Sequence, residues 1–157
     1  MAQIGSFVAA SFCALSPCDR IFTWIGASDR IMENKSTFFV EMEETKSFIE
    51  QATQNSLVIV DELGWGTSTF DGFAIAEAVL NHLVKNIKAR TLFTTHYHMM
   101  IDSFAHDKNI EFMKMDCEVD GDKVKFLYKF VKGATDNSQG LYVAKMAGVP
   151  SNVLQIA

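Results

Sequence analysis

The chain has 157 residues, of which 48% are hydrophobic and 21% are charged, and it contains only two prolines. This composition excludes a disordered tail and a collagen-like repeat, and a chain of this length can bury a sizeable core without disulfides or metal ions. The 14 basic residues against 19 acidic ones give a formal net charge of −5 without a basic cluster, so the electrostatic signature of a stand-alone nucleic-acid-binding domain is missing.

The first predicted elements are a strand and an amphipathic helix. Apolar residues over 20–25 predict a strand that ends at Gly26. The helix begins at Ser36 or Thr37, because serine and threonine are favourable N-caps. Its expected apolar face, at helical spacing among acidic residues, consists of Phe38, Met42, Ile49 and Ala52.

A βαβ unit is predicted next. The aliphatic run 57–60 predicts a strand buried on both faces, and a helix over 71–87 and a strand over 90–95 follow. Such a unit has parallel strands, and ligands of open α/β sheets bind outside the carboxyl ends of those strands. Asp61-Glu62 and His96 stand at these ends.

The pattern changes after His96. Two strand-like segments, 110–118 and 124–131, flank the turn sequence Asp120-Gly121-Asp122 and predict an antiparallel hairpin. Short helices over 141–147 and after Pro150 complete the prediction. We expect one α/β domain over 1–157, with a mostly parallel sheet, flanking helices and this C-terminal hairpin.

The cysteines and the apolar runs bear on the cellular compartment. Cys13, Cys18 and Cys117 are an odd number without a CxxC pair, which favours free thiols in a reducing compartment over a disulfide framework or a zinc site. No apolar run is long enough for a membrane span, and no export signal is visible. We expect a cytosolic or nuclear protein without a membrane partner.

An aliphatic strand that ends in Asp61-Glu62 is the arrangement that a nucleotide hydrolase needs, because the aspartate can hold Mg²⁺ while the glutamate polarises the attacking water. Alone the pattern is weak, since acidic residues often end strands where the chain returns to solvent. His96 could touch a terminal phosphate, although a lone histidine is more often structural. The loop 63–69, with two glycines and three hydroxyl residues, allows close approach to a phosphate or a facing subunit, or is simply a flexible turn.

Residues 56–72, SLVIVDELGWGTSTFDG, resemble the signature of the MutS family of DNA mismatch-repair ATPases. Segments 19–32 and 36–42 agree in order and spacing, and resemble the eukaryotic MutS-alpha type, which forms a mismatch-sensing heterodimer. The similarity covers 1–157. It implies a partial ABC-type P-loop ATPase fold, ATP and Mg²⁺ as cofactors, a MutS-homologue partner subunit, and a location in the nucleus.

The resemblance also implies roles for individual residues. Asp61 would be the Walker B magnesium ligand, Glu62 the residue that activates water, and His96 the switch residue that senses the γ-phosphate. His98 would be structural.

Further residues would act across the dimer. The resemblance implies that Ser36 and Thr37 open a helix whose N-terminus faces the γ-phosphate held by the partner subunit. Thr67 and Ser68 would belong to the loop that contacts the partner. The family usually has arginine where this chain has Trp24 and Trp65, and an indole cannot pair with a carboxylate or phosphate. A tryptophan at position 65 could still stack in a dimer interface, but we expect the substitution to impair this loop.

The phosphate-cradling motif GxxxxGK[ST] is missing, because the chain contains no Gly-Lys dipeptide. The resemblance implies that 1–157 is the C-terminal part of a MutS-type ATPase domain, truncated at both ends, and that mismatched DNA binds domains outside this chain. We expect no ATP turnover by the chain alone, although the family hydrolyses ATP. Two alternatives stay open: a non-catalytic module that completes the site of a MutS-type partner in trans, and another ABC-type ATPase, against which 61–72 argues.

Overall fold

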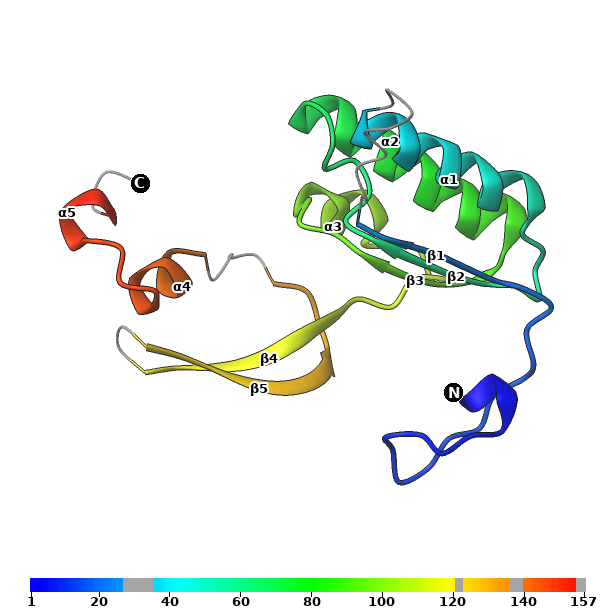
Figure 1. The fold of residues 1–157 in the computed structure, drawn as a ribbon, viewed down its shortest axis with the longest axis horizontal. Coiled ribbons are helices and arrows are strands. Elements are labelled where there is room, and N and C mark those ends of the chain that lie inside the picture. Colours follow the sequence, from blue (N-terminus) through cyan, green and yellow to red (C-terminus); the bar gives the residue numbers. More distant parts are fainter. Residues whose placement is uncertain (27–35, 121–122, 136–139, 155–157) are drawn as a thin grey trace. The chain divides into compact units, whose positions relative to one another are not determined.

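The computed structural model of the chain describes residues 1–26, 36–120, 123–135 and 140–154 (Figure 1). Part of the segment 19–32 used above, the turn residues 121–122 and the end of the last helix lie outside the described residues. Residues 1–97 form one compact unit. Its elements are the short 3₁₀ turn η1 (Ala2–Ile4), β1 (Ile21–Ile25), α1 (Thr37–Gln51), β2 (Leu57–Asp61), α2 (Thr69–His82), η3 (Leu83–Ile87) and β3 (Arg90–Thr94).

The centre of this unit is a parallel three-stranded sheet in the order β1-β2-β3. In the strand register, Asp61 of β2 lies opposite both Ile25 of β1 and Thr94 of β3. The predicted βαβ unit is confirmed. Because the strands are parallel, their carboxyl ends meet at one edge of the sheet.

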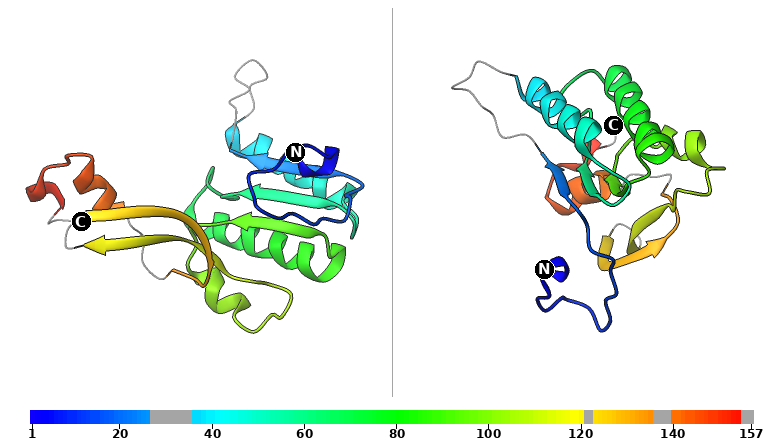
Figure 2. Two further views of the ribbon diagram at one scale, coloured as in Figure 1. Left: turned by 90° about the horizontal axis from the view of Figure 1, so that it is seen from below. Right: turned by 90° about the vertical axis from the view of Figure 1, so that its right-hand side faces the viewer.

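Helices α1 and α2 lie on the same face of the sheet (Figures 1 and 2). Under them, Val58 and Val60 are fully buried, and such side chains each stabilise the fold by roughly 1.5–3 kcal/mol. On the opposite face, Ile25 and Leu92 are 66% and 56% exposed, and Ile59 is only partly buried. The prediction of a strand buried on both faces is therefore corrected to one buried face, because both helices lie on the same side.

Helix α1 starts where the sequence predicts. Ser36 is its N-cap, and the Ser36 hydroxyl accepts a hydrogen bond from the Phe39 backbone N–H at 3.2 Å. The deeply buried residues, however, are Val40, Glu41, Thr45 and Phe48, whereas the predicted apolar face is only partly buried. Polar residues tolerate this burial because they are hydrogen-bonded: the Thr45 hydroxyl, for example, donates to the Glu41 carbonyl at 2.8 Å.

Helix α2 is capped by Ser68, whose hydroxyl accepts from the Asp71 backbone N–H at 3.3 Å. The helix ends in a wide π-helical turn, η3. There the Lys88 N–H donates to the Leu83 carbonyl at 2.7 Å, and Lys88 adopts a left-handed φ of 60°. The predicted helix over 71–87 is thus an α-helix followed by a different type of turn.

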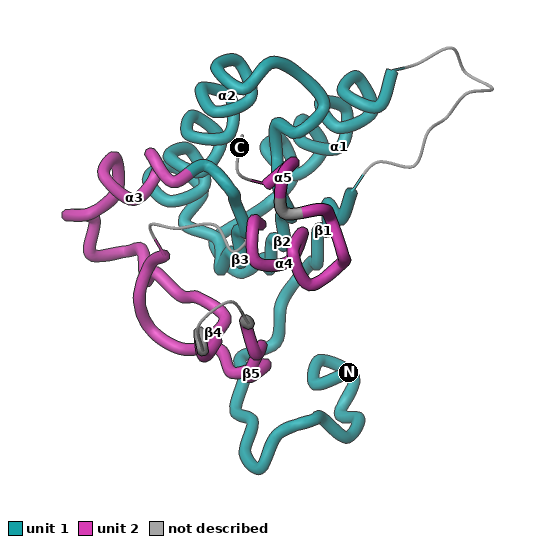
Figure 3. Tube along the Cα trace, turned by 90° about the vertical axis from the view of Figure 1, so that its left-hand side faces the viewer, with its two compact units in different colours: residues 1–97 teal, residues 98–157 magenta. Residues whose placement is uncertain are grey.

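Residues 98–157 form the second compact unit (Figure 3). Strands β4 (Met113–Asp120) and β5 (Lys123–Lys132) pair antiparallel, as predicted, with an irregularity between Met115 and Cys117. The first of these strands begins three residues later than the prediction. The other elements of this unit are α3 (Met99–Phe104), which the sequence analysis missed, α4 (Gly140–Met146) and α5 (Ser151–Leu154).

All three cysteines are free thiols, as predicted. Within the described ranges, no helix has the length and apolar character needed to cross a membrane.

Candidate functional site

Two acidic residues and a threonine meet at the carboxyl end of β2. The Thr94 hydroxyl donates a short hydrogen bond to the Asp61 carboxylate. The backbone N–H of Glu62 donates to both the carbonyl and the hydroxyl oxygen of Thr94, each at 3.2 Å. Thr94 therefore fixes the position of both acidic residues. The sequence analysis did not single it out, although its place two residues before His96 could have drawn attention to it.

Glu62 has an unusual backbone conformation. Its φ is 52°, in the left-handed region that residues other than glycine rarely adopt, and its side chain is exposed. Such a conformation costs about 1 kcal/mol or more and persists where the surrounding structure imposes it. Here the two hydrogen bonds that the Glu62 N–H donates to Thr94, together with the buried Leu63, hold it in place.

The oxygen atoms at this edge suit Mg²⁺. They are the partly buried Asp61 carboxylate, the exposed Glu62 carboxylate and the Thr94 hydroxyl, and oxygen ligands are those that Mg²⁺ prefers. Among the residues that the structure describes, no cluster of three or more His, Cys, Asp or Glu side chains could hold a metal ion. Since Mg²⁺ is commonly bound through one or two carboxylates together with substrate phosphates and water, this donor set fits a magnesium-nucleotide complex.

His96 lies beside the loop that follows Glu62. The rings of His96 and Trp65 meet edge to face, with their centroids 4.9 Å apart and an interplanar angle of 77°. The Trp65 side chain is 69% exposed and His96 is also exposed. The Trp65 indole therefore contacts His96, the residue predicted to sense a terminal phosphate.

The second tryptophan of the chain, Trp24, has a different environment. It is 6% exposed and lies opposite Val60 in the sheet register. Trp24 is thus a core residue of β1.

The loop 65–68 packs against the first turn of α1. A β-carbon added at Gly66 would lie 3.0 Å from the β-carbon of Phe38. The structure therefore brings this loop next to the first turn of α1, which begins at Thr37 after the N-cap Ser36. The hydroxyl of Ser36 caps its own helix, and Thr37 is half-buried.

The predicted interface residues Thr67 and Ser68 differ in environment. Thr67 is half-buried, whereas Ser68 is exposed. Besides capping α2, the Ser68 hydroxyl donates to the Asp71 carboxylate at 2.7 Å. This pair fixes the point at which the loop joins the helix.

The Gly64 peptide groups connect this loop to two other elements. The Gly64 N–H donates to Glu41 Oε1 of α1 at 2.7 Å, and the Tyr97 hydroxyl donates to the Gly64 carbonyl at 3.0 Å. Burial, followed by the negative charges of Glu41 and Glu62, raises the pKa of Tyr97. Sequence reasoning missed Glu41 and Tyr97. A carboxylate in the middle of an amphipathic helix was the only available signal.

His98 belongs to the second unit. Its Nδ1 lies 2.9 Å from the Thr135 carbonyl oxygen, a contact that gives the ring a structural partner.

Comparison with known proteins places this geometry in a family context. The model of MutS domain V matches residues 1–157. The DNA mismatch repair protein Msh6 of Gallus gallus is 48% identical over 162 residues, and that of Homo sapiens is 49% identical over 162 residues; each alignment covers 99% of this chain. The DNA mismatch repair protein MutS of Carboxydothermus hydrogenoformans is 46% identical over 157 residues, which is 100% of this chain. The chain spans 12% of the length of the two Msh6 proteins and 19% of the MutS protein.

Proposed function

The chain belongs to the MutS family of DNA mismatch-repair proteins, and from this premise we propose that it carries the magnesium-binding and water-activating carboxylates of a MutS-type ATPase. The observation that supports the proposal is the meeting of Asp61, Glu62 and Thr94 at one strand end, with His96 following the neighbouring strand. In this proposal Asp61 holds the cation and Glu62 is the catalytic residue.

In this proposal, the chain's own residues orient the attacking water molecule and sense the terminal phosphate. Bound Mg²⁺-ATP would supply the electrophilic γ-phosphoryl group, with part of its charge offset by the cation. Thr94 holds the Asp61 carboxylate at the strand end and anchors the Glu62 backbone, so the Glu62 side chain is presented from a fixed point. Its carboxylate accepts a hydrogen bond from the attacking water and orients it. His96 senses the terminal phosphate from the adjacent strand end.

We propose a second role for the first turn of α1 and the loop 65–68. Ser36 and Thr37 begin a helix whose N-terminus carries a partial positive charge that favours an anion, and the loop packs against that turn. In the proposed dimer, Ser36 and Thr37 face the ATP phosphates held by a MutS-type partner subunit. Thr67 and Ser68 contact that subunit, and the exposed Trp65 beside them weakens the contact, because an indole cannot pair with a carboxylate or phosphate.

We further propose that, in a full-length protein of this family, these sites couple ATP binding and hydrolysis to recognition of mismatched DNA and movement of a clamp, in the nucleus. The family supports this part of the proposal. The geometry of the described residues supports the nucleotide site.

The experiment is a chimera in which residues 1–157 replace the matching segment of a vertebrate relative. It is purified with a MutS-type partner whose own catalytic glutamate has been replaced, so that steady-state ATP turnover reports on this chain's site. We expect turnover in the unsubstituted chimera and a loss of about 100-fold or more in Glu62→Gln. Glu50→Gln on the exposed side of α1 is the matched control and should leave turnover unchanged. An inactive chimera, or an active Glu62→Gln chimera, would contradict the proposal.

We expect no ATP turnover from the chain alone, because it contains no Gly-Lys dipeptide and so no P-loop lysine. The alternative function is a module that docks on a MutS-type partner and completes its site in trans. The packing of loop 65–68 against the first turn of α1 favours it, because these elements would form one continuous surface. Adding the chain to such a partner tests the alternative: bound chain and altered turnover support it, and no binding excludes it.

A further inference from the structure

The peptide groups of Gly64 are held from two sides by buried side chains. Glu41, which is 3% exposed, accepts the Gly64 N–H at 2.7 Å, and Tyr97, which is 5% exposed, donates to the Gly64 carbonyl at 3.0 Å. A hydrogen bond to a carboxylate is roughly twice as strong as one between neutral groups. Since burial raises the pKa of Tyr97, its phenol stays protonated and remains a donor.

Close packing from α2 fixes the same peptide. Gly64 has a φ of 94°, which favours glycine, and a β-carbon there would lie 2.5 Å from the Gly72 carbonyl oxygen. A β-carbon at Gly72 would lie 2.3 Å from both the Gly64 carbonyl oxygen and the Tyr97 hydroxyl. Gly64 is thus confined by α1, by α2 and by the segment after β3.

The proposed catalytic and sensing residues lie close to Gly64 or to its hydrogen-bond partner Tyr97 in the sequence. Glu62 precedes Gly64 by two residues, with the fully buried Leu63 between them. His96 directly precedes Tyr97, and its ring contacts Trp65, the residue after Gly64. A shift of the Gly64 peptide would therefore displace both Glu62 and His96.

We propose that Glu41 and Tyr97 are positioning residues that hold the Gly64 peptide and thereby fix Glu62 and His96 relative to helix α1. This inference rests on the proposed ATPase function and extends it to residues to which that function assigns no role. It also connects α1 to the Glu62 backbone through the Gly64 peptide: the helix capped by Ser36 carries Glu41 five residues later. Movement of α1 would then be transmitted to Glu62.

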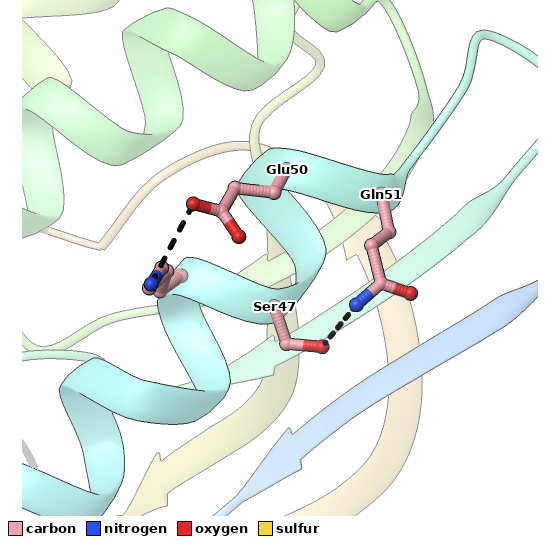
Figure 4. Close-up of polar contacts among 4 residues, drawn as sticks. Ser47, Glu50 and Gln51 are labelled. Atoms are coloured by element: carbon pink, nitrogen blue, oxygen red, sulfur yellow. Dashed lines mark hydrogen bonds and ion pairs between the residues drawn. The ribbon is translucent and has the colours of Figure 1, made fainter.

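The kinetic test uses the chimera described above. Because a displaced Glu62 still permits nucleotide binding, we expect Glu41→Gln and Tyr97→Phe each to lower kcat about 10-fold while KM for ATP stays unchanged. The matched controls are Glu50→Gln and Tyr128→Phe. Glu50 lies on the same helix with an exposed carboxylate 3.8 Å from Lys46 Nζ, near the separate Ser47–Gln51 hydrogen bond (Figure 4), and Tyr128 is 83% exposed. Both controls should retain full turnover.

A second readout follows the Gly64 peptide in the isotope-labelled chain of 157 residues. In amide NMR spectra, Glu41→Gln should shift the resonances of Gly64, Glu62 and His96, whereas Glu50→Gln should leave them in place. Circular dichroism confirms that each variant is folded, and Tyr97→Phe supplies an independent test if Glu41→Gln does not fold.

The outcomes separate the two proposals. An active unsubstituted chimera in which both positioning variants retain kcat would overturn the inference and leave the proposed function intact. A fall in kcat together with the amide shifts supports both. An inactive chimera contradicts the proposed function, and the amide resonances then decide whether Glu41 and Tyr97 hold the peptide: unshifted resonances at Glu62 and His96 overturn the inference.

Discussion

The two compact units of the chain are stabilised in different ways. In residues 1–97 a parallel sheet and two helices enclose fully buried side chains, such as Val58, Leu63 and Leu83. In the described part of residues 98–157, the buried hydrophobic side chains are only Met100, Phe104 and Val124. In the hairpin of this second unit, apolar residues are exposed to solvent; Phe130, for example, is 63% exposed. The first unit thus depends on side-chain packing and the second on backbone pairing between β4 and β5.

The largest predicted difference in stability between the two units concerns a glycine-to-alanine substitution in each. Gly72→Ala in the first unit should lower the free energy of unfolding by about 4 kcal/mol, because the new β-carbon would overlap the Gly64 carbonyl and the Tyr97 hydroxyl. The control is Gly148→Ala in the second unit, where an added β-carbon would have no neighbour within 4 Å among the described residues. Only the φ of 87° opposes alanine there, and we expect a loss of about 1 kcal/mol in the free energy of unfolding. Urea denaturation followed by circular dichroism measures both. Equal losses would contradict the comparison.

The next test compares a leucine-to-alanine substitution in each unit. Leu63→Ala should cost about 3 kcal/mol, since the side chain is fully buried and its removal leaves a cavity. Leu141→Ala removes the same atoms from a side chain that is 53% exposed, and should cost less than about 0.5 kcal/mol. If Leu141→Ala proves as costly as Leu63→Ala in thermal unfolding, the second unit is better packed than the structure indicates.

Helix caps should have a smaller effect. Ser36→Ala and Ser68→Ala each remove a hydroxyl that accepts from a backbone N–H at the start of a helix, and each should cost about 1 kcal/mol. Ser103→Ala in α3 removes only an exposed hydroxyl that donates to the Met99 carbonyl at 3.4 Å, so its cost should be below about 0.5 kcal/mol. Hydrogen exchange of the first-turn amides of α1 and α2 reports the loss of each cap directly. Unchanged exchange would be evidence against the capping roles.

The smallest expected effect is a dependence on alkaline pH. Burial raises the pKa of Tyr97 above its unfolded value of about 10, so the folded chain holds this proton more tightly. The resulting stability is fully present below about pH 10 and is lost as pH rises through the folded pKa. Tyr97→Phe should therefore flatten the fall in stability above about pH 10, relative to Tyr128→Phe as the control for loss of a tyrosine. A wild-type alkaline slope in Tyr97→Phe would contradict this assignment.

The elements of the first unit could be predicted because their signals are local. Strand 57–61, the Ser36 cap and the succession of strand, helix and strand all follow from hydrophobic patterns and cap residues. Helix α3 was missed because it is only six residues long, too short for a periodic pattern. The π-helical turn 83–87 has the same apolar spacing as the helix that it ends, so the sequence alone does not reveal it.

The acidic residues and His96 of the candidate site could be predicted because they end strands. The residues that hold them in place could not be predicted. The buried position of Glu41 depends on an acceptor being needed at the Gly64 N–H, which becomes apparent only when α1 and the loop meet. Thr94 acquires its role through its register opposite Asp61. Predictions based on hydrophobic periodicity place carboxylates on the outside of helices, and so assign Glu41 to the wrong face.

The two tryptophans have a practical consequence. Trp24 of β1 is 6% exposed and lies in the core of the first unit, whereas Trp65 is 69% exposed and contacts His96 at the candidate site. The chain therefore contains two intrinsic fluorophores with distinct surroundings. A water-soluble quencher such as iodide will reach Trp65 and spare Trp24, so the quenched fraction of the emission reports on the loop and the remainder on the folded core. A nucleotide or a partner subunit that covers the loop can be followed by its protection from the quencher, without a label.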